Sequence, residues 1–60
     1  MNKGLILMSI DLAERYLDEA HNTSVDEDSL KTYEHLHKAM DVIIQTLNVL
    51  ANEGDEFYER

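Results

Sequence analysis

The chain contains no cysteine, no proline and no tryptophan, and it has only two glycines among 60 residues. Without cysteine it can form neither a disulfide nor a thiolate metal site. A chain this short buries only about 60% of the surface that its unfolded form exposes, so a lone monomer is marginal. The remaining means of stabilisation are a metal held by histidines and carboxylates, or association with a partner.

Basic residues are also scarce, because five Lys and Arg stand against 13 Asp and Glu, a net charge of −8. Such a charge argues against direct binding to nucleic acid or to an anionic membrane. The apolar run Leu5–Ile10 is too short for a signal peptide and is followed at once by Asp11. No run approaches the ~20 apolar residues of a membrane span. We therefore expect a soluble, cytoplasmic protein.

What the chain does have is helical periodicity together with many Leu, Ala and Glu residues, which favour helix. Over residues 4–20 an apolar stripe recurs in steps of four and three, which is typical of helices that pack against each other. We expect this helix to end near His21, with Asn22 as a left-handed terminal residue. The stripe consists of Ile6, Ile10, Ala13, Leu17 and Ala20.

A second helix is expected over about residues 25–52. Ser24 and Glu27 fit a capping box at its start. An alternative start at Ser29 would leave residues 22–28 as a longer loop. Its apolar stripe, with steps of three and four, consists of Tyr33, Leu36, Met40, Ile43, Leu47 and Leu50.

These elements predict an all-α fold, a two-helix antiparallel hairpin within a single domain of residues 1–60, with residues 53–60 as an acidic C-terminal tail. The apolar arc of the first helix spans roughly 200°, about twice what one neighbouring helix covers. We therefore expect a second copy to complete a four-helix bundle, and the sequence leaves parallel or antiparallel pairing open. The residues expected at this oligomer interface are Ile6, Ile10, Leu12, Ala13, Tyr16, Leu17, Leu36, Met40, Ile43, Leu47 and Leu50.

The chemistry-bearing residues point to no catalytic or cofactor site. Glu34, His37 and Asp41 share a helix face that could hold zinc, but Lys38 sits among them and would repel a cation. The acidic stretch at residues 26–29 lacks the glycine and glutamate that a calcium loop requires at fixed places. We therefore expect no catalytic residue, no cofactor and no metal, and hence not an enzyme.

A further set of residues is expected to contact a protein partner. Two valines flank the stripe of the second helix, and the acidic tail carries two aromatic residues of the kind found in interfaces. The tail acids serve either solubility or docking onto a basic surface, and both explanations stay open. The candidate contacts are Val42, Val49, Glu53, Asp55, Glu56, Phe57 and Tyr58.

Together these features predict a small acidic protein that oligomerises and acts by binding a partner protein, as a regulator, adaptor or antagonist. Two alternatives remain. The net charge of −8 would suit an acidic mimic of nucleic acid that blocks a basic groove. A dimer could also build a metal-binding or enzymatic site at its interface.

Overall fold

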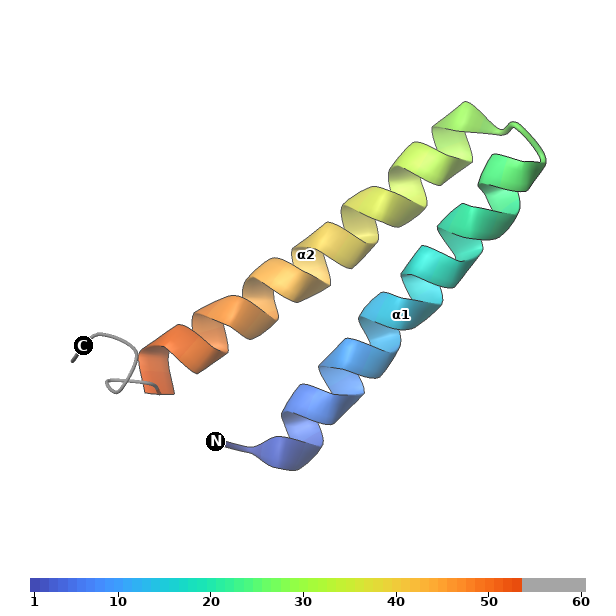
Figure 1. Cartoon of the computed structure of the whole chain (residues 1–60). Helices are drawn as coiled ribbons and strands as arrows, with labels where there is room; N and C mark the ends of the chain where they lie inside the picture. Colours follow the sequence, from blue (N-terminus) through green and yellow to red (C-terminus); the bar gives the residue numbers. More distant parts are fainter. Residues whose placement is uncertain (54–60) are drawn as a thin grey trace, which may run out of the picture.

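The computed structural model of the chain describes residues 1–53, which form two α-helices joined by a short loop. Helix α1 spans Lys3–Val25 and helix α2 spans Ser29–Glu53. The helices lie side by side and run in opposite directions, so the N-terminus and the end of α2 share one end of the hairpin (Figure 1). The expected all-α, two-helix hairpin is confirmed.

Helix α1 is longer than the sequence pattern predicted. It begins where the side chain of Asn2 accepts a hydrogen bond of 3.1 Å from the backbone N–H of Leu5, which satisfies one of the free donors of the first turn. It continues to Val25, so the expected end at residue 20 is wrong, and His21 and Asn22 both lie within the helix.

The end of α1 is a Schellman motif built around Glu27. The backbone N–H of Glu27 donates to the carbonyl of Ser24, and that of Asp28 donates to the carbonyl of Thr23, at 3.0 and 2.9 Å. Glu27 adopts a left-handed conformation with φ of 59°, a place that glycine or asparagine usually takes. The left-handed residue is therefore Glu27, and the expectation for Asn22 is wrong.

Helix α2 starts at Ser29, so the expected start at residue 25 with Ser24 as the cap is wrong and the alternative start is confirmed. The cap is Asp28, whose Oδ1 accepts from the backbone N–H of Lys31 at 3.1 Å. Its carbonyl accepts from the N–H of Thr32 at 3.0 Å. A carboxylate at this position also suits the positive end of the helix dipole.

The two helices meet along a seam of mostly small side chains that repeat in steps of three and four. Four of its members are buried, namely Ile6, Ala13, Ala20 and Ala39, and the others are half-buried. Small side chains at a helix contact let the helix axes approach closely. The seam consists of Ile6, Ser9, Ala13, Tyr16, Ala20 and Thr23 on α1, and Thr32, His35, Ala39, Val42, Thr46 and Val49 on α2.

Polar contacts also cross the seam, mainly near the loop. The hydroxyls of Thr23 and Thr32 form a hydrogen bond of 2.8 Å. Nδ1 of His35 lies 3.3 Å from Oε1 of Glu19, a charged pair only when the histidine is protonated, without the geometry of a hydrogen bond. Further along, the ammonium of Lys38 lies 5.9 Å from the centre of the Tyr16 ring. These contacts fix which residues of α1 and α2 lie at the same height.

Candidate protein-interaction surface

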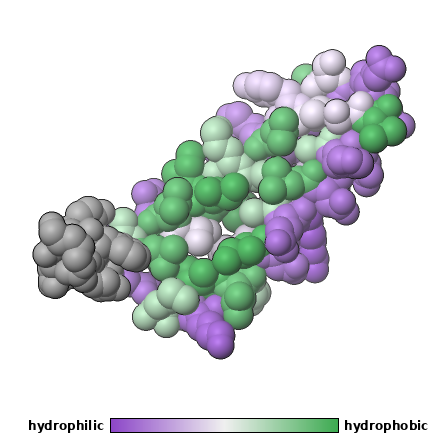
Figure 2. All heavy atoms as spheres, viewed as in Figure 1, coloured by the Kyte–Doolittle hydropathy of each residue, from purple (hydrophilic) through white to green (hydrophobic). Residues whose placement is uncertain are grey.

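The large apolar side chains of the hairpin gather on one face, next to the seam and outside it. Six of them are 43–58% exposed although both helices contribute to their surroundings. Figure 2 shows hydrophobic residues over both helices along the middle of this side, with hydrophilic residues along the outer side of α1. We call the six residues the apolar face: Ile10, Leu17, Leu36, Met40, Ile43 and Leu47.

The position of this face follows from helix geometry. Each of its α2 residues stands one residue after a seam residue, or about 100° further round the helix. Leu50, which lines the same hollow, has this relation to Val49. The stripe expected on α2 is therefore real, but it points to one side of α1 instead of into it. A side chain in this position meets a second layer of helices more readily than its own hairpin partner.

A shallow hollow runs across the apolar face toward the end with the termini. Both helices line it, and its lining is aliphatic except for Ser9, Glu14 and Thr46. Side chains at the floor belong to the seam, while those at the rim belong to the apolar face. The lining residues are Ile6, Ser9, Ile10, Ala13, Glu14, Leu17, Ile43, Thr46, Leu47 and Leu50.

The opposite side of the seam carries a smaller apolar area, which we call the back patch: Leu5, Met8, Leu12 and two residues at the border of the seam, Val42 and Val49. Leu5, Met8 and Leu12 line one hollow with Ser9, and Leu5, Val42 and Val49 line the next. Leu5 and Met8 were not among the candidates from the sequence, although their spacing to Leu12 is helical.

The residues expected at the oligomer interface thus fall into three groups. Most lie on the apolar face or its hollow, as Leu17 and Leu50 do. Ile6 and Ala13 are buried in the seam within one chain. Leu12 is 41% exposed on the back patch, and Tyr16 is half-buried beside Lys38 on that side. One flat contact with a second copy cannot cover all three groups.

The expected partner contacts are described only in part. Val42 and Val49 are half-buried and share a hollow with Leu5. Oε1 of Glu53 lies 3.2 Å from the N-terminal amine, so this carboxylate joins the two ends of the hairpin. The remaining candidates, Asp55, Glu56, Phe57 and Tyr58, lie outside the described residues.

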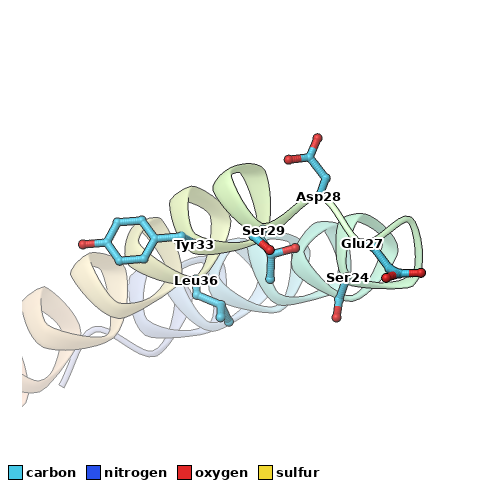
Figure 3. A pocket seen from close by; sticks show the side chains of 7 residues that line it. Ser24, Glu27, Asp28, Ser29, Tyr33 and Leu36 are labelled. Carbon is cyan, nitrogen blue, oxygen red and sulfur yellow. The ribbon is translucent and has the colours of Figure 1, made fainter.

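A third hollow lies at the loop end of the hairpin, and its character differs (Figure 3). Tyr33 and Leu36 of α2 form its apolar side, while Ser24, Ser29 and the loop acids form the rest. In Figure 3 the carboxylates of Glu27 and Asp28 point in different directions. Acidic groups that diverge in this way do not offer a shared set of ligands to a cation.

His37 and the residues near it form pairwise contacts. Nδ1 of His37 lies 3.4 Å from Oδ2 of Asp41, and the His37 ring lies 5.9 Å from the Tyr33 ring between centroids. Lys38 extends to the other side, over Tyr16. Within residues 1–53 no three or more His, Asp or Glu side chains are placed to hold a metal ion.

Comparisons with known proteins give no relative from which the role of this surface could be inferred. No family model matches the chain, and no curated protein or solved structure shows significant similarity to it. Within the part of the chain that the structure describes, neither helix has a stretch long and apolar enough to cross a membrane.

Proposed function

We propose that the protein is a non-catalytic interaction protein that pairs through its apolar face into a four-helix bundle and acts by binding another protein. The observation that carries this proposal is the apolar face itself, with six large aliphatic side chains each 43–58% exposed. Contiguous exposed apolar surface of this kind marks a site of association. Closed homodimers are the commonest assemblies of soluble proteins.

The size of the face supports a dimer. Completing the burial of one half-exposed Leu, Ile or Met side chain contributes roughly 1 kcal/mol. Twelve such side chains, six from each copy, contribute on the order of 10 kcal/mol. The loss of free motion on association costs about 4–15 kcal/mol. The face is therefore of the size that a dimer of moderate affinity needs, and its apolar neighbours Leu7, Tyr33 and Ile44 add to it.

The back patch supports the second half of the proposal. A dimer through the apolar face leaves Leu5, Met8 and Leu12 accessible on the outside of each hairpin, where Met8 is 71% exposed. Methionine and leucine at an exposed hollow suit contact with an apolar segment of a partner. The net charge of −8 favours a partner with a basic rim, through faster encounter and selection against acidic surfaces.

Two matched substitutions test the dimer. Leu47→Glu places a charge on the apolar face, and Leu12→Glu makes the same change on the back patch. Their side chains are 58% and 41% exposed, so neither removes much packing from a single hairpin. Mass is measured by light scattering from 1 to 200 µM protein, and helicity by circular dichroism.

The proposal expects a dimer of about 14 kDa for the unchanged chain and for Leu12→Glu, and a helical monomer for Leu47→Glu at the same concentration. Burying a glutamate at the dimer interface should raise the Kd of the dimer by a factor of about 100 or more. A monomeric unchanged chain at 200 µM contradicts the dimer. Equal dissociation by the two substitutions contradicts its assignment to the apolar face.

A further inference from the structure

We propose that the second copy lies on the apolar face with its loop at the same end, so that α1 of each chain stacks on α2 of its partner. The proposal rests on the proposed dimer and adds its geometry. Two closed arrangements keep all neighbouring helices antiparallel. In the first, the two-fold axis is parallel to the helices, the loops lie at the same end, and α1 stacks on α2. In the second, the axis is perpendicular to the helices, the loops lie at opposite ends, and α1 stacks on α1 and α2 on α2.

The charges beside the apolar face distinguish these arrangements. Counted round α1 from the seam residue Ala13, three carboxylates lie on the outer side of the face: Asp11, Glu14 and Asp18. All three are exposed. Figure 2 shows this hydrophilic border along the outer side of α1. We call these residues the acidic edge.

Helix α2 carries different residues in the same angular positions. Counted from its seam residue Ala39, the places that correspond to Asp11, Glu14 and Asp18 hold no carboxylate. The corresponding residues are His37, Met40 and Ile44. The two edges of the hairpin therefore differ in charge. The α1 edge carries three carboxylates, with Arg15 3.4 Å from Asp11, and the α2 edge carries apolar residues and His37, with Asp41 3.4 Å from the histidine.

Stacking α1 on α1 would bring two acidic edges together, with six carboxylates along one border of the bundle. Like charges across an interface disfavour that arrangement. Stacking α1 on α2 instead places each acidic edge against an edge with a single nearby carboxylate, that of Asp41, which lies 3.4 Å from His37. The aliphatic stem of Glu14 then lies along the partner's Met40 while its carboxylate reaches solvent.

The heights of the residues add a specific contact. Across the seam Glu19 lies at the height of His35, and Tyr16 at that of Lys38, so Asp18 lies within about one residue of the height of His37. Rotation about an axis parallel to the helices leaves the position of each residue along the bundle unchanged. It therefore brings Asp18 of one chain to the edge that carries the partner's His37.

The apolar face also changes along its length. Near the termini its hollow is lined by aliphatic side chains such as Ile10 and Leu47. At the loop end a separate hollow is lined by Tyr33 and Leu36 together with serines, Thr32 and the loop acids. Loops at the same end place aliphatic layers on aliphatic layers, whereas opposite loops would place part of the aliphatic half against the end that carries the serines and loop acids.

Two spin-label distances test the arrangement, and the absence of native cysteine makes each label unique. Ser24→Cys and Lys3→Cys, each made alone, place a nitroxide near the two ends of α1, about 32 Å apart along the helix. Both residues are exposed. Pulsed electron spin resonance then measures the distance between the two copies of each label, and light scattering on the same samples gives the mass.

Loops at the same end give a short distance, below about 25 Å, at both positions, because helices in a bundle lie 8–10 Å apart. With loops at opposite ends, the two separations along the bundle sum to about 63 Å, so at least one exceeds about 30 Å. A dimer with one long distance overturns this arrangement and leaves the proposed function intact. A monomeric mass overturns both.

A charge substitution gives an independent reading. His37→Lys places a cation beside the partner's acidic edge, so we expect a dimer that is several-fold tighter. Gln45→Lys adds a cation on the side of the back patch, where Gln45 lines the hollow with Val42, and controls for the change in net charge. Equal effects of the two lysines, or a weaker dimer with His37→Lys, contradict the stacking of α1 on α2.

Discussion

The seam and the apolar face lie one residue apart on α2, yet they are built from opposite kinds of side chain. The seam closes the hairpin mostly with small side chains such as alanine, serine, threonine and valine, and three of its four buried residues are alanine. The apolar face carries the long aliphatic side chains and leaves them 43–58% exposed. In a protein that acts alone the larger side chains occupy the interior. This reversed order agrees with the proposal that the apolar face binds a second copy.

The energetic consequence is that one hairpin has little to stabilise it. Burying an alanine removes much less apolar area from water than burying a leucine, and the gain scales with that area. A chain of 60 residues is already close to the limit of independent stability. We therefore expect most of the folding free energy to come from the apolar face, through contact with a second copy.

The largest expected effect is a dependence of thermal stability on concentration. For a folded dimer that melts to two unfolded chains, a hundredfold increase in protein concentration stabilises the folded state by about 2.7 kcal/mol. In a domain of this size that corresponds to a rise in Tm of roughly 5–15 °C. Circular dichroism melts from 2 to 200 µM measure the shift. A Tm that stays constant over this range would mean that the seam alone holds the fold.

The next effect separates the seam from the face within the chain. Ala39 is 1% exposed, so Ala39→Leu has no free space at the contact between the helices. Overpacking of this kind costs about 1–3 kcal/mol, and we expect a fall in Tm of at least about 5 °C. The measurement is a melt at fixed concentration.

The matched control for that substitution is its neighbour. Met40→Leu introduces the same residue one position later, where the side chain is 45% exposed, and conserves its volume. We expect a change below about 0.5 kcal/mol. If both variants lose stability equally, then the seam is not the closely packed surface and the distinction between the two surfaces fails.

The helices and their apolar stripes could be predicted from the sequence, but the choice between the two surfaces could not. On α2 both the seam and the stripe of Leu36, Met40 and Ile43 repeat in steps of three and four, so periodicity fits either. Hydrophobicity favours the stripe. The structure closes the hairpin on the small residues beside it, because close approach of the backbones depends on side-chain size as well as polarity.

The loop shows the same limit in local form. Ser24 and Glu27 match a capping box, but so does any Ser three residues before a Glu, and the helix dipole favours acids anywhere in residues 26–28. Asn22 is a common left-handed residue, whereas Glu27 is not. The observed helix ends depend on how the seam residues of α1 and α2 line up against each other, and most of those residues lie far from the loop.

A substitution at the cap tests whether Asp28 or Ser24 caps the second helix. Asp28→Ala removes the bond from the carboxylate to the N–H of Lys31, and loss of such a cap costs about 1 kcal/mol. Ser24→Ala is the control, because Ser24 lies inside α1 and contributes its carbonyl, not its hydroxyl, to the loop. We expect a change below about 0.5 kcal/mol there. Chemical denaturation measures the free energy of unfolding of both variants. A larger loss of stability for Ser24→Ala would favour the start of the second helix at residue 25, with Ser24 as its cap.

The smallest expected effect is a gain, at Glu27. A left-handed conformation costs a residue with a Cβ about 1–2 kcal/mol, and glycine avoids that strain but gives up about 0.5–1 kcal/mol in chain entropy. Glu27→Gly should therefore stabilise the protein by about 0.5–1 kcal/mol. Glu27→Gln keeps the Cβ and removes the charge, so an equal gain there would assign the effect to charge. Because Glu27 is not one of the residues of the apolar face, the gain from glycine should be the same at 2 and 200 µM, whereas every effect that acts through the face changes with concentration.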